Sequence, residues 1–171
     1  PTSGMATRAH RLYLVRHAIA AERGPQWPRD EERPITKDGA ARMREIVKGV
    51  RRLDESIDLI LTSPLARARQ TADLLAAGLS PAPAIRAVAA LAPGSSPPQI
   101  LAALSALRTR AEAIALVGHE PGLGLLAAWL ISARTPTPFK KGGICRIALD
   151  DWPPARGGRL IWLAPPKMRR R

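Results

Sequence analysis

The chain has 171 residues, a length typical of a single domain, and 46% of them are hydrophobic, which excludes disordered and fibrous proteins. Its 27 Lys and Arg residues outnumber 14 Asp and Glu, so the formal net charge is +13. A single cysteine excludes a disulfide scaffold and a zinc site built on paired thiolates. The longest apolar run, residues 123–131, is far shorter than the ~20 residues that a membrane span needs.

The charge by itself is compatible with three partners: nucleic acid, an anionic membrane or a phosphorylated substrate. Aromatic residues make up 4% of the chain and none lies in a basic aromatic motif, which disfavours nucleic acid. No apolar signal segment occurs near the N-terminus, so a cytoplasmic monomer that binds neither nucleic acid nor membrane is expected. Residues 1–4 are expected to be a cloning remnant, residues 5–166 one domain, and residues 167–171 a solvated basic tail.

Strand-like and helix-like segments alternate along the chain. Short apolar runs predict strands at 12–15, 59–61, 85–91, 114–117, 144–149 and 159–163, the last two as a hairpin. Apolar spacing and capping signals predict helices over 36–53, 63–79, 99–109 and from 121 to about 133.

Thr36 is the expected N-cap of the first helix, and Ser63 that of the second, with Pro64 at its first helical position. Irregular loops are predicted at 20–34 and 93–98. The pattern as a whole predicts an α/β three-layer sandwich, with a mostly parallel central sheet flanked by helices.

Polar side chains follow three of the predicted strands. Arg16 and His17 come after the first strand, Arg67 after the second and His119 after the fourth. Because ligands of open α/β sheets bind at the carboxyl ends of the strands, these residues predict an anion site, most naturally for phosphate. His17 could attack phosphorus and form a covalent phosphohistidine, while the other three stabilise the phosphoryl oxygens. This chemistry requires no metal and no cofactor.

Four segments resemble the signatures of the histidine phosphatase superfamily. Residues 14–18 (LVRHA) resemble its RHG or RHA motif, and residues 62–72 (TSPLARARQTA) are similar to its SPxxRAxQTA segment. Residues 117–122 (VGHEPG) resemble its second-histidine motif, and residues 33–39 (RPITKDG) its RPLTxxG stretch. In this order and in a chain this short, the segments look most like the SixA-type phosphohistidine phosphatases.

The resemblance covers residues 12–163 and implies a role for each motif residue. His17 corresponds to the phosphorylated nucleophile, and Arg16, Arg67 and His119 to the rest of the phosphate pocket. Larger members insert a helical cap after the third strand, for which residues 91–114 are too few, so an open pocket is expected.

The chain departs from the family at the general acid. Many members have a Glu after the third strand, where this chain has 89–93 (AALAP), and no carboxylate lies between Asp73 and Glu112. Glu120 and Glu22 are possible substitutes, although Glu120 is equally explained as an acidic residue at a helix N-terminus. A weak or absent acid favours substrates with good leaving groups, such as phosphohistidine.

The expected function is therefore that of a metal-independent phosphatase, acting most naturally on phosphohistidine in proteins. A broad small-molecule phosphomonoesterase and a non-catalytic phosphate-binding module are the alternatives. A mutase is disfavoured because it needs a closed pocket. Cys145 is expected to be a small core residue, and Trp129, Trp152 and Trp162 are expected to be packing residues. Trp27 could line the entrance of the site or equally fix the loop in which it lies.

Overall fold

The computed structural model describes residues 9–136 and 138–166. The expected remnant 1–4 and the basic tail 167–171 lie outside the described residues. Six strands form the central sheet: β1 (His10–Arg16), β2 (Leu59–Thr62), β3 (Ala84–Ala87), β4 (Ala113–Gly118), β5 (Ile144–Leu149) and β6 (Arg159–Ala164). The helices are α1 (Lys37–Arg52), α2 (Ala66–Ala77), α3 (Pro97–Ala106) and α4 (Gly122–Leu130), with the 3-10 turns η1 (Asp30–Glu32) and η2 (Ala89–Leu91).

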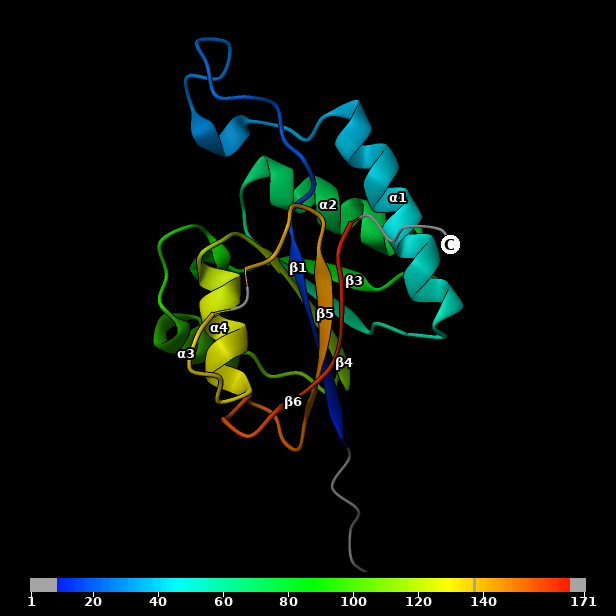
Figure 1. Ribbon diagram of the computed structural model, residues 1–171, viewed down its shortest axis with the longest axis vertical. Helices are drawn as coiled ribbons and strands as arrows, with labels where there is room; N and C mark the ends of the chain where they lie inside the picture. The colour runs from blue at the N-terminus through cyan, green and yellow to red at the C-terminus, as the bar shows by residue number, and fades with distance from the viewer. Residues whose placement is uncertain (1–8, 137, 167–171) are drawn as a thin grey trace, which may run out of the picture.

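The sheet has the order β3-β2-β4-β1-β5-β6. Its first four strands are parallel to one another, β5 is antiparallel to β1, and β6 is antiparallel to β5. The predicted mostly parallel sheet and the predicted hairpin of the last two strands are confirmed. Helices α1 and α2 cover one face of the sheet, and α3 and α4 cover the other (Figure 1), which confirms the three layers.

The core consists of two apolar layers, one on each face of the sheet. Successive side chains of a strand point to opposite faces, so Leu12 and Leu14 pack with α3 and α4 while Tyr13 and Val15 pack with α1 and α2. Every residue of β2 and β4 is buried, as their continuous apolar runs predicted. The expected core residue Cys145 is 1% exposed, and burial raises the pKa of its thiol to about 12.

Strand β4 lies between β1 and β2, and this placement brings three strand ends together. Arg16 at the end of β1 is in register with Gly118 at the end of β4, and Thr62 at the end of β2 is in register with Val117. The residue that follows each strand is therefore held at one edge of the sheet, where the β1–α1 loop projects (blue, top of Figure 1).

Several predicted boundaries are wrong by two to four residues. The second helix begins at Ala66 rather than at Ser63, and Ser63 is not its N-cap. It ends at Ala77, and the last helix ends at Leu130 instead of near Ala133. The third strand ends at Ala87, since 89–91 turn into η2.

Local hydrogen bonds explain two of these corrections. Ser63 continues the pairing of β2 with β4, since its N–H donates to the carbonyl of Val117, and the helix starts beyond Pro64. The third helix starts at Pro97, earlier than predicted, because Ser96 forms a capping box with Gln99 and proline suits the first helical position. It ends at Ala106 rather than at Thr109. The predicted N-cap Thr36 is confirmed, since its side chain accepts the N–H of Gly39.

A polar cluster centred on Glu55 lies on the face of the sheet that α1 and α2 cover, where Tyr13 and Trp162 also pack. The carboxylate of Glu55, whose side chain is 5% exposed, accepts hydrogen bonds from Tyr13, from Arg146 at 2.8 Å and from Trp162 at 3.0 Å. Burial by itself would raise the pKa of Glu55, but these three donors outweigh it and lower the pKa. The cluster joins β1, β5 and β6 to the α1–β2 connection.

We predict that Glu55→Ala lowers the free energy of unfolding by about 2–3 kcal/mol, because it leaves three donors without their acceptor. Glu45→Ala, which removes an exposed carboxylate paired with Lys48, is the control and should change it by less than about 0.5 kcal/mol. Urea denaturation measures both. Equal effects of the two substitutions would contradict a structural role for the cluster.

Candidate active site

His17 directly follows β1 and is 6% exposed. Its backbone N–H donates to the carbonyl of Gly118 at 3.0 Å, which ties it to the end of β4. Its ring Nδ1 lies 2.7 Å from the carbonyl oxygen of Ala18. Because a carbonyl can only accept, Nδ1 carries the hydrogen of the neutral ring and Nε2 keeps its lone pair. The N–H of Ala18 donates in turn to Thr71 at 2.9 Å. The ring therefore presents Nε2 as a nucleophile in a fixed orientation.

His119 follows β4 and shares the pocket with His17. It is 6% exposed, and the two ring centroids are 5.1 Å apart. Its Nε2 lies 2.7 Å from Oγ of Ser63, the residue after β2. Its Nδ1 is buried and has no hydrogen-bond partner among the described residues.

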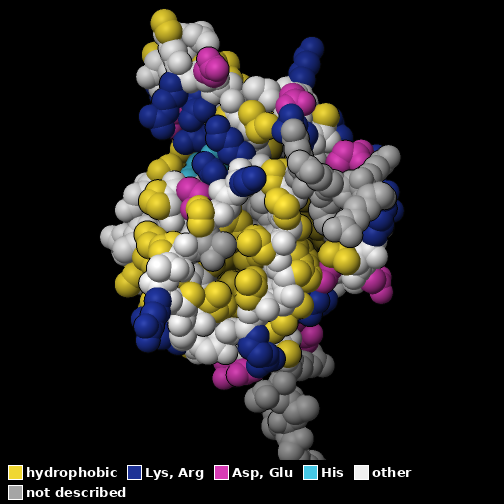
Figure 2. All heavy atoms as spheres, viewed as in Figure 1, with side chains coloured by type: hydrophobic (Ala, Val, Ile, Leu, Met, Phe, Trp, Pro, Cys, Tyr) yellow, Lys and Arg dark blue, Asp and Glu magenta, His cyan; other side chains and the backbone are white. Residues whose placement is uncertain are grey.

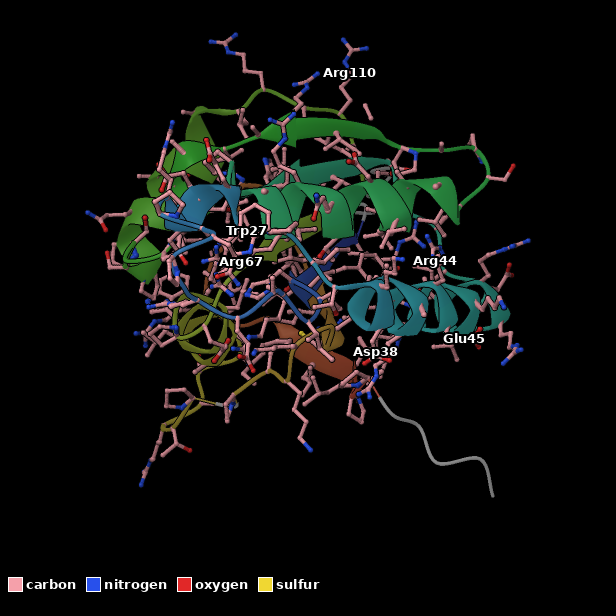
Figure 3. The ribbon with its side chains drawn as sticks, turned by 90° about the horizontal axis from the view of Figure 1, so that it is seen from above. Trp27, Asp38, Arg44, Glu45, Arg67 and Arg110 are labelled. Carbon is pink, nitrogen blue, oxygen red and sulfur yellow. The ribbon has the colours of Figure 1, made fainter. Side chains whose placement is uncertain are left out.

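Both predicted arginines use some of their N–H groups in hydrogen bonds to other residues of the chain. Arg16 donates from Nη1 to the carbonyl of Phe139 at 2.6 Å. Arg67 donates from Nη1 and Nη2 to the backbone and the carboxylate of Asp30, at 3.0 and 3.1 Å. In each arginine the Nε atom is buried without a hydrogen-bond partner in the described part of the chain. Figure 3 shows Arg67 at the same end of the molecule as Trp27 of the β1–α1 loop, while Arg44 and Glu45 lie on the opposite side, in the middle of α1.

The structure thus brings together all four residues that the sequence predicted for the phosphate pocket. Three of them keep a buried nitrogen that has no partner in residues 9–136 and 138–166. An unsatisfied buried polar group costs about 1–3 kcal/mol. The charges of Arg16 and Arg67 act on both histidines, and the charge of Lys141 acts on His17. Lys and Arg side chains surround the visible histidine atoms in Figure 2. Such a group of donors and cations suits a compact oxyanion.

Both histidines are neutral at physiological pH. Burial, helped by the charges of Arg67, Arg16 and Lys141, lowers the pKa of His17 to about 4, although the Ala18 carbonyl opposes the shift. Burial and the charges of His17 and Arg67 lower the pKa of His119 to about 3. A neutral imidazole is the form that can act as a nucleophile.

The positions of Glu120 and Glu22 do not decide which of them, if either, is the proton donor. Glu120 is half-buried beside the pocket, and its Oε1 accepts the N–H of Gly124 at 2.8 Å in the first turn of α4. Burial raises the pKa of its carboxyl group, against the effects of that hydrogen bond and the charge of Arg16. Glu22 is exposed in the β1–α1 loop. The role of Glu120 as a proton donor stays a prediction.

Sequence reasoning missed three residues of the site. Asp30 holds both Nη atoms of Arg67 and also accepts from Nε of Arg33 at 3.0 Å. Burial by itself would raise the pKa of Asp30, but these two arginines outweigh it and lower the pKa. Ser63 contacts His119, and Lys141 lies in the turn whose Gly142 donates to the carbonyls of Arg16 and His17. Only Ser63 lies inside a recognised motif, where it was interpreted as a helix cap.

A small hollow lies beside His119. It is lined by η2, the loop that follows it and the start of α4, with Leu91, Ile100 and Leu123 among its apolar residues.

The segment between β3 and β4 contains only η2 and α3, so the predicted lack of a cap domain is confirmed for the described chain. In that part of the chain no group of three or more His, Cys, Asp or Glu side chains is arranged to hold a metal ion. No helix within 9–136 and 138–166 is long and apolar enough to span a membrane.

The chain is similar to proteins of one family. The model of the histidine phosphatase superfamily (branch 1) matches residues 12–91. An uncharacterized protein of Picosynechococcus is 39% identical over 137 residues, which cover 78% of this chain and 81% of that protein. The phosphohistidine phosphatase SixA of Escherichia coli is 28% identical over 156 residues, which cover 91% and 93%.

Comparison of structures gives the same family. The structure of the protein histidine phosphatase SixA complexed with tungstate has a TM-score of 0.80 and 25% identity, covering 91% of this chain and 97% of that chain. The chain belongs to the histidine phosphatase superfamily. Its class of activity is that of a phosphatase.

We predict that neither His17 nor His119 takes up a proton between pH 8 and pH 5.5, because their pKa values of about 4 and 3 lie below this range. Long-range ¹H–¹⁵N spectra of the labelled protein, recorded in phosphate-free buffer across this range, measure the protonation of each ring. A midpoint between pH 6 and 7 for either ring would show that the pocket is more hydrated than the structure has it.

Proposed function

We propose that the protein hydrolyses phosphohistidine in phosphorylated proteins through a covalent phosphohistidine intermediate on His17, without a metal ion. The observation that carries the proposal is the pairing of a neutral, oriented His17 with three buried nitrogens that lack partners among the described residues, on Arg16, Arg67 and His119. A nucleophile and a set of oxyanion donors thus share one pocket. A binding module would need only the donors.

The reaction proceeds in two displacements. Nε2 of His17 attacks phosphorus, the P–N bond of the substrate breaks, and the substrate imidazole, protonated on its other nitrogen, leaves as a neutral ring. Water then attacks the phosphorus, and the bond between phosphorus and Nε2 breaks. Both hydrogens of the water leave on the inorganic phosphate, as H2PO4−, and His17 returns to its neutral form. Arg16, Arg67 and His119 stabilise the negative charge of the phosphoryl oxygens in both steps.

The weakness of the candidate acid favours phosphohistidine over alkyl phosphates. The sequence lacks the family carboxylate after the third strand, and Glu120 accepts a backbone N–H, so a strong acid for an alkoxide leaving group is missing.

The open site and the relatives support a protein substrate. No cap covers the pocket in the described chain, so a side chain on a protein surface can reach His17. The similar enzyme of Escherichia coli is a phosphohistidine phosphatase, and the similar SixA structure holds tungstate, an oxyanion of phosphate-like shape.

A broad small-molecule phosphomonoesterase is the second candidate. One observation favours it: burial raises the pKa of Glu120, whose carboxyl group lies close enough to Arg16 to interact with its charge. A carboxyl group that stays protonated at higher pH is a better proton donor. If Glu120 turns toward the leaving group when substrate binds, alkyl esters become substrates as well.

We predict that Arg67→Ala lowers kcat/KM by a factor of about 100 to 1,000, the usual loss for one donor to a developing oxyanion. Arg69→Ala is the matched control, since Arg69 is an exposed residue of the same helix, and it should leave the rate within about twofold. Steady-state kinetics on p-nitrophenyl phosphate measures both. A loss of less than about tenfold for Arg67→Ala would refute its contact with the phosphoryl group.

The experiment that tests the function compares a phosphohistidine-bearing protein, p-nitrophenyl phosphate and an alkyl phosphomonoester as substrates. We expect turnover of the first two and little of the third, because only the alkyl ester requires a strong acid. His17→Ala should abolish all turnover together with the acid-labile, base-stable ³²P label that quenching traps on the wild-type enzyme.

Each other outcome has a definite meaning. Efficient cleavage of the alkyl ester favours the phosphomonoesterase, and Glu120→Gln then tests its donor. If nothing is cleaved while phosphate raises the melting temperature, the protein is a phosphate-binding module. Undiminished turnover by His17→Ala would overturn the proposed nucleophile.

A further inference from the structure

Ser63 was expected to cap the second helix, and that role does not explain its position. It is fully buried at the end of β2, and its backbone N–H donates to the carbonyl of Val117. Its hydroxyl has two neighbours: the N–H of Leu65, at 3.2 Å, and Nε2 of His119, at 2.7 Å. Pro64 has no N–H, so the backbone donor that reaches this oxygen comes from Leu65.

The donors and acceptors around this hydroxyl can be satisfied in only one complete way. The N–H of Leu65 must donate, so Oγ of Ser63 accepts it. The hydroxyl hydrogen then needs an acceptor, and Nε2 of His119 is the only one within hydrogen-bond distance in the described chain. If His119 instead donated from Nε2, a buried hydroxyl hydrogen would stay unpaired, which is costly.

We propose that Ser63 is a positioning residue that donates its hydroxyl hydrogen to Nε2 of His119 and thereby keeps the ring hydrogen on Nδ1. This inference rests on the proposed function for its purpose, since Nδ1 is the buried nitrogen of His119 that has no hydrogen-bond partner in the described chain. A hydrogen on Nδ1 makes it a donor to a phosphoryl oxygen. The opposite tautomer would direct a lone pair at that anion and repel it.

The proposal assigns the same tautomer to both pocket histidines, by different means. In His17 the carbonyl of Ala18 accepts from Nδ1 and frees Nε2 for attack. In His119 the hydroxyl of Ser63 donates to Nε2 and leaves Nδ1–H for binding. One ring is thereby set as a nucleophile and the other as a donor while both are neutral.

The tautomer of His119 can be measured directly. The chain contains three histidines, so a long-range ¹H–¹⁵N spectrum of the histidine-labelled protein at pH 7 has few signals, which His10→Gln and His17→Ala assign by subtraction. We expect a protonated Nδ1 and an unprotonated Nε2 for His119 in the wild type. In Ser63→Ala we expect loss of this pattern, with the hydrogen moved to Nε2 or exchanging between the two nitrogens.

Thr62→Val is the matched control. Thr62 is as buried as Ser63 and adjacent to it, but its hydroxyl donates to the carbonyl of Ser63 rather than to a histidine. The tautomer of His119 should be unchanged in this variant. Should Ser63→Ala fail to fold, Ser63→Cys, with its weakly donating thiol, replaces it, and the wild-type spectrum by itself still tests the assignment.

Binding of inorganic phosphate gives a second readout. We expect Ser63→Ala to weaken it by about tenfold or more, the value of a hydrogen bond to a charged group, and Thr62→Val to leave it unchanged. A wild-type His119 protonated on Nε2, or a Ser63→Ala spectrum like that of the wild type, would overturn the proposal. Because these measurements need no turnover, they are distinct from a failure of the proposed function, which the substrate assay alone decides.

Discussion

The position of β4 between β1 and β2 is the constraint on which the site depends. Parallel register along these strands places the residues after Arg16, Thr62 and Gly118 at one edge. Backbone hydrogen bonds continue the pairing just beyond the strands, from His17 to Gly118 and from Ser63 to Val117. Close-packed apolar layers on both faces fix the strands, and the side chains at the strand ends are therefore held in fixed positions.

The pocket combines features that oppose folding. Two arginines and two histidines are buried or partly buried at one edge, and three of their nitrogens have no hydrogen-bond partner among the described residues. Burial and the charges of the two arginines keep the histidines neutral, and Asp30 compensates part of the charge of Arg67. In the proposed function, a phosphoryl group supplies the acceptors and the negative charge that these groups lack. The groups that oppose folding are then the ones that would bind the ligand.

Much of this arrangement could be predicted from the sequence because its signals are local. Continuous apolar runs ended by polar residues located the strands, and the motifs around His17, Arg67 and His119 located the pocket. Boundaries were less accurate where strand pairing competes with capping, as at Ser63. Asp30 escaped prediction because its partner Arg67 is 37 residues away and no periodic pattern links the two.

The sequence by itself determined the strand and helix alternation, the family motifs and the chemical groups available for phosphoryl transfer, since each depends on residue types at short spacing. Only the tertiary structure decided how those groups are used. It showed that Ser63 bonds to His119 rather than capping a helix, and that Glu120 accepts a backbone N–H. It also showed which nitrogen of each histidine is free. Hydrogen-bond partners across a sheet depend on strand order and register, which no local pattern encodes.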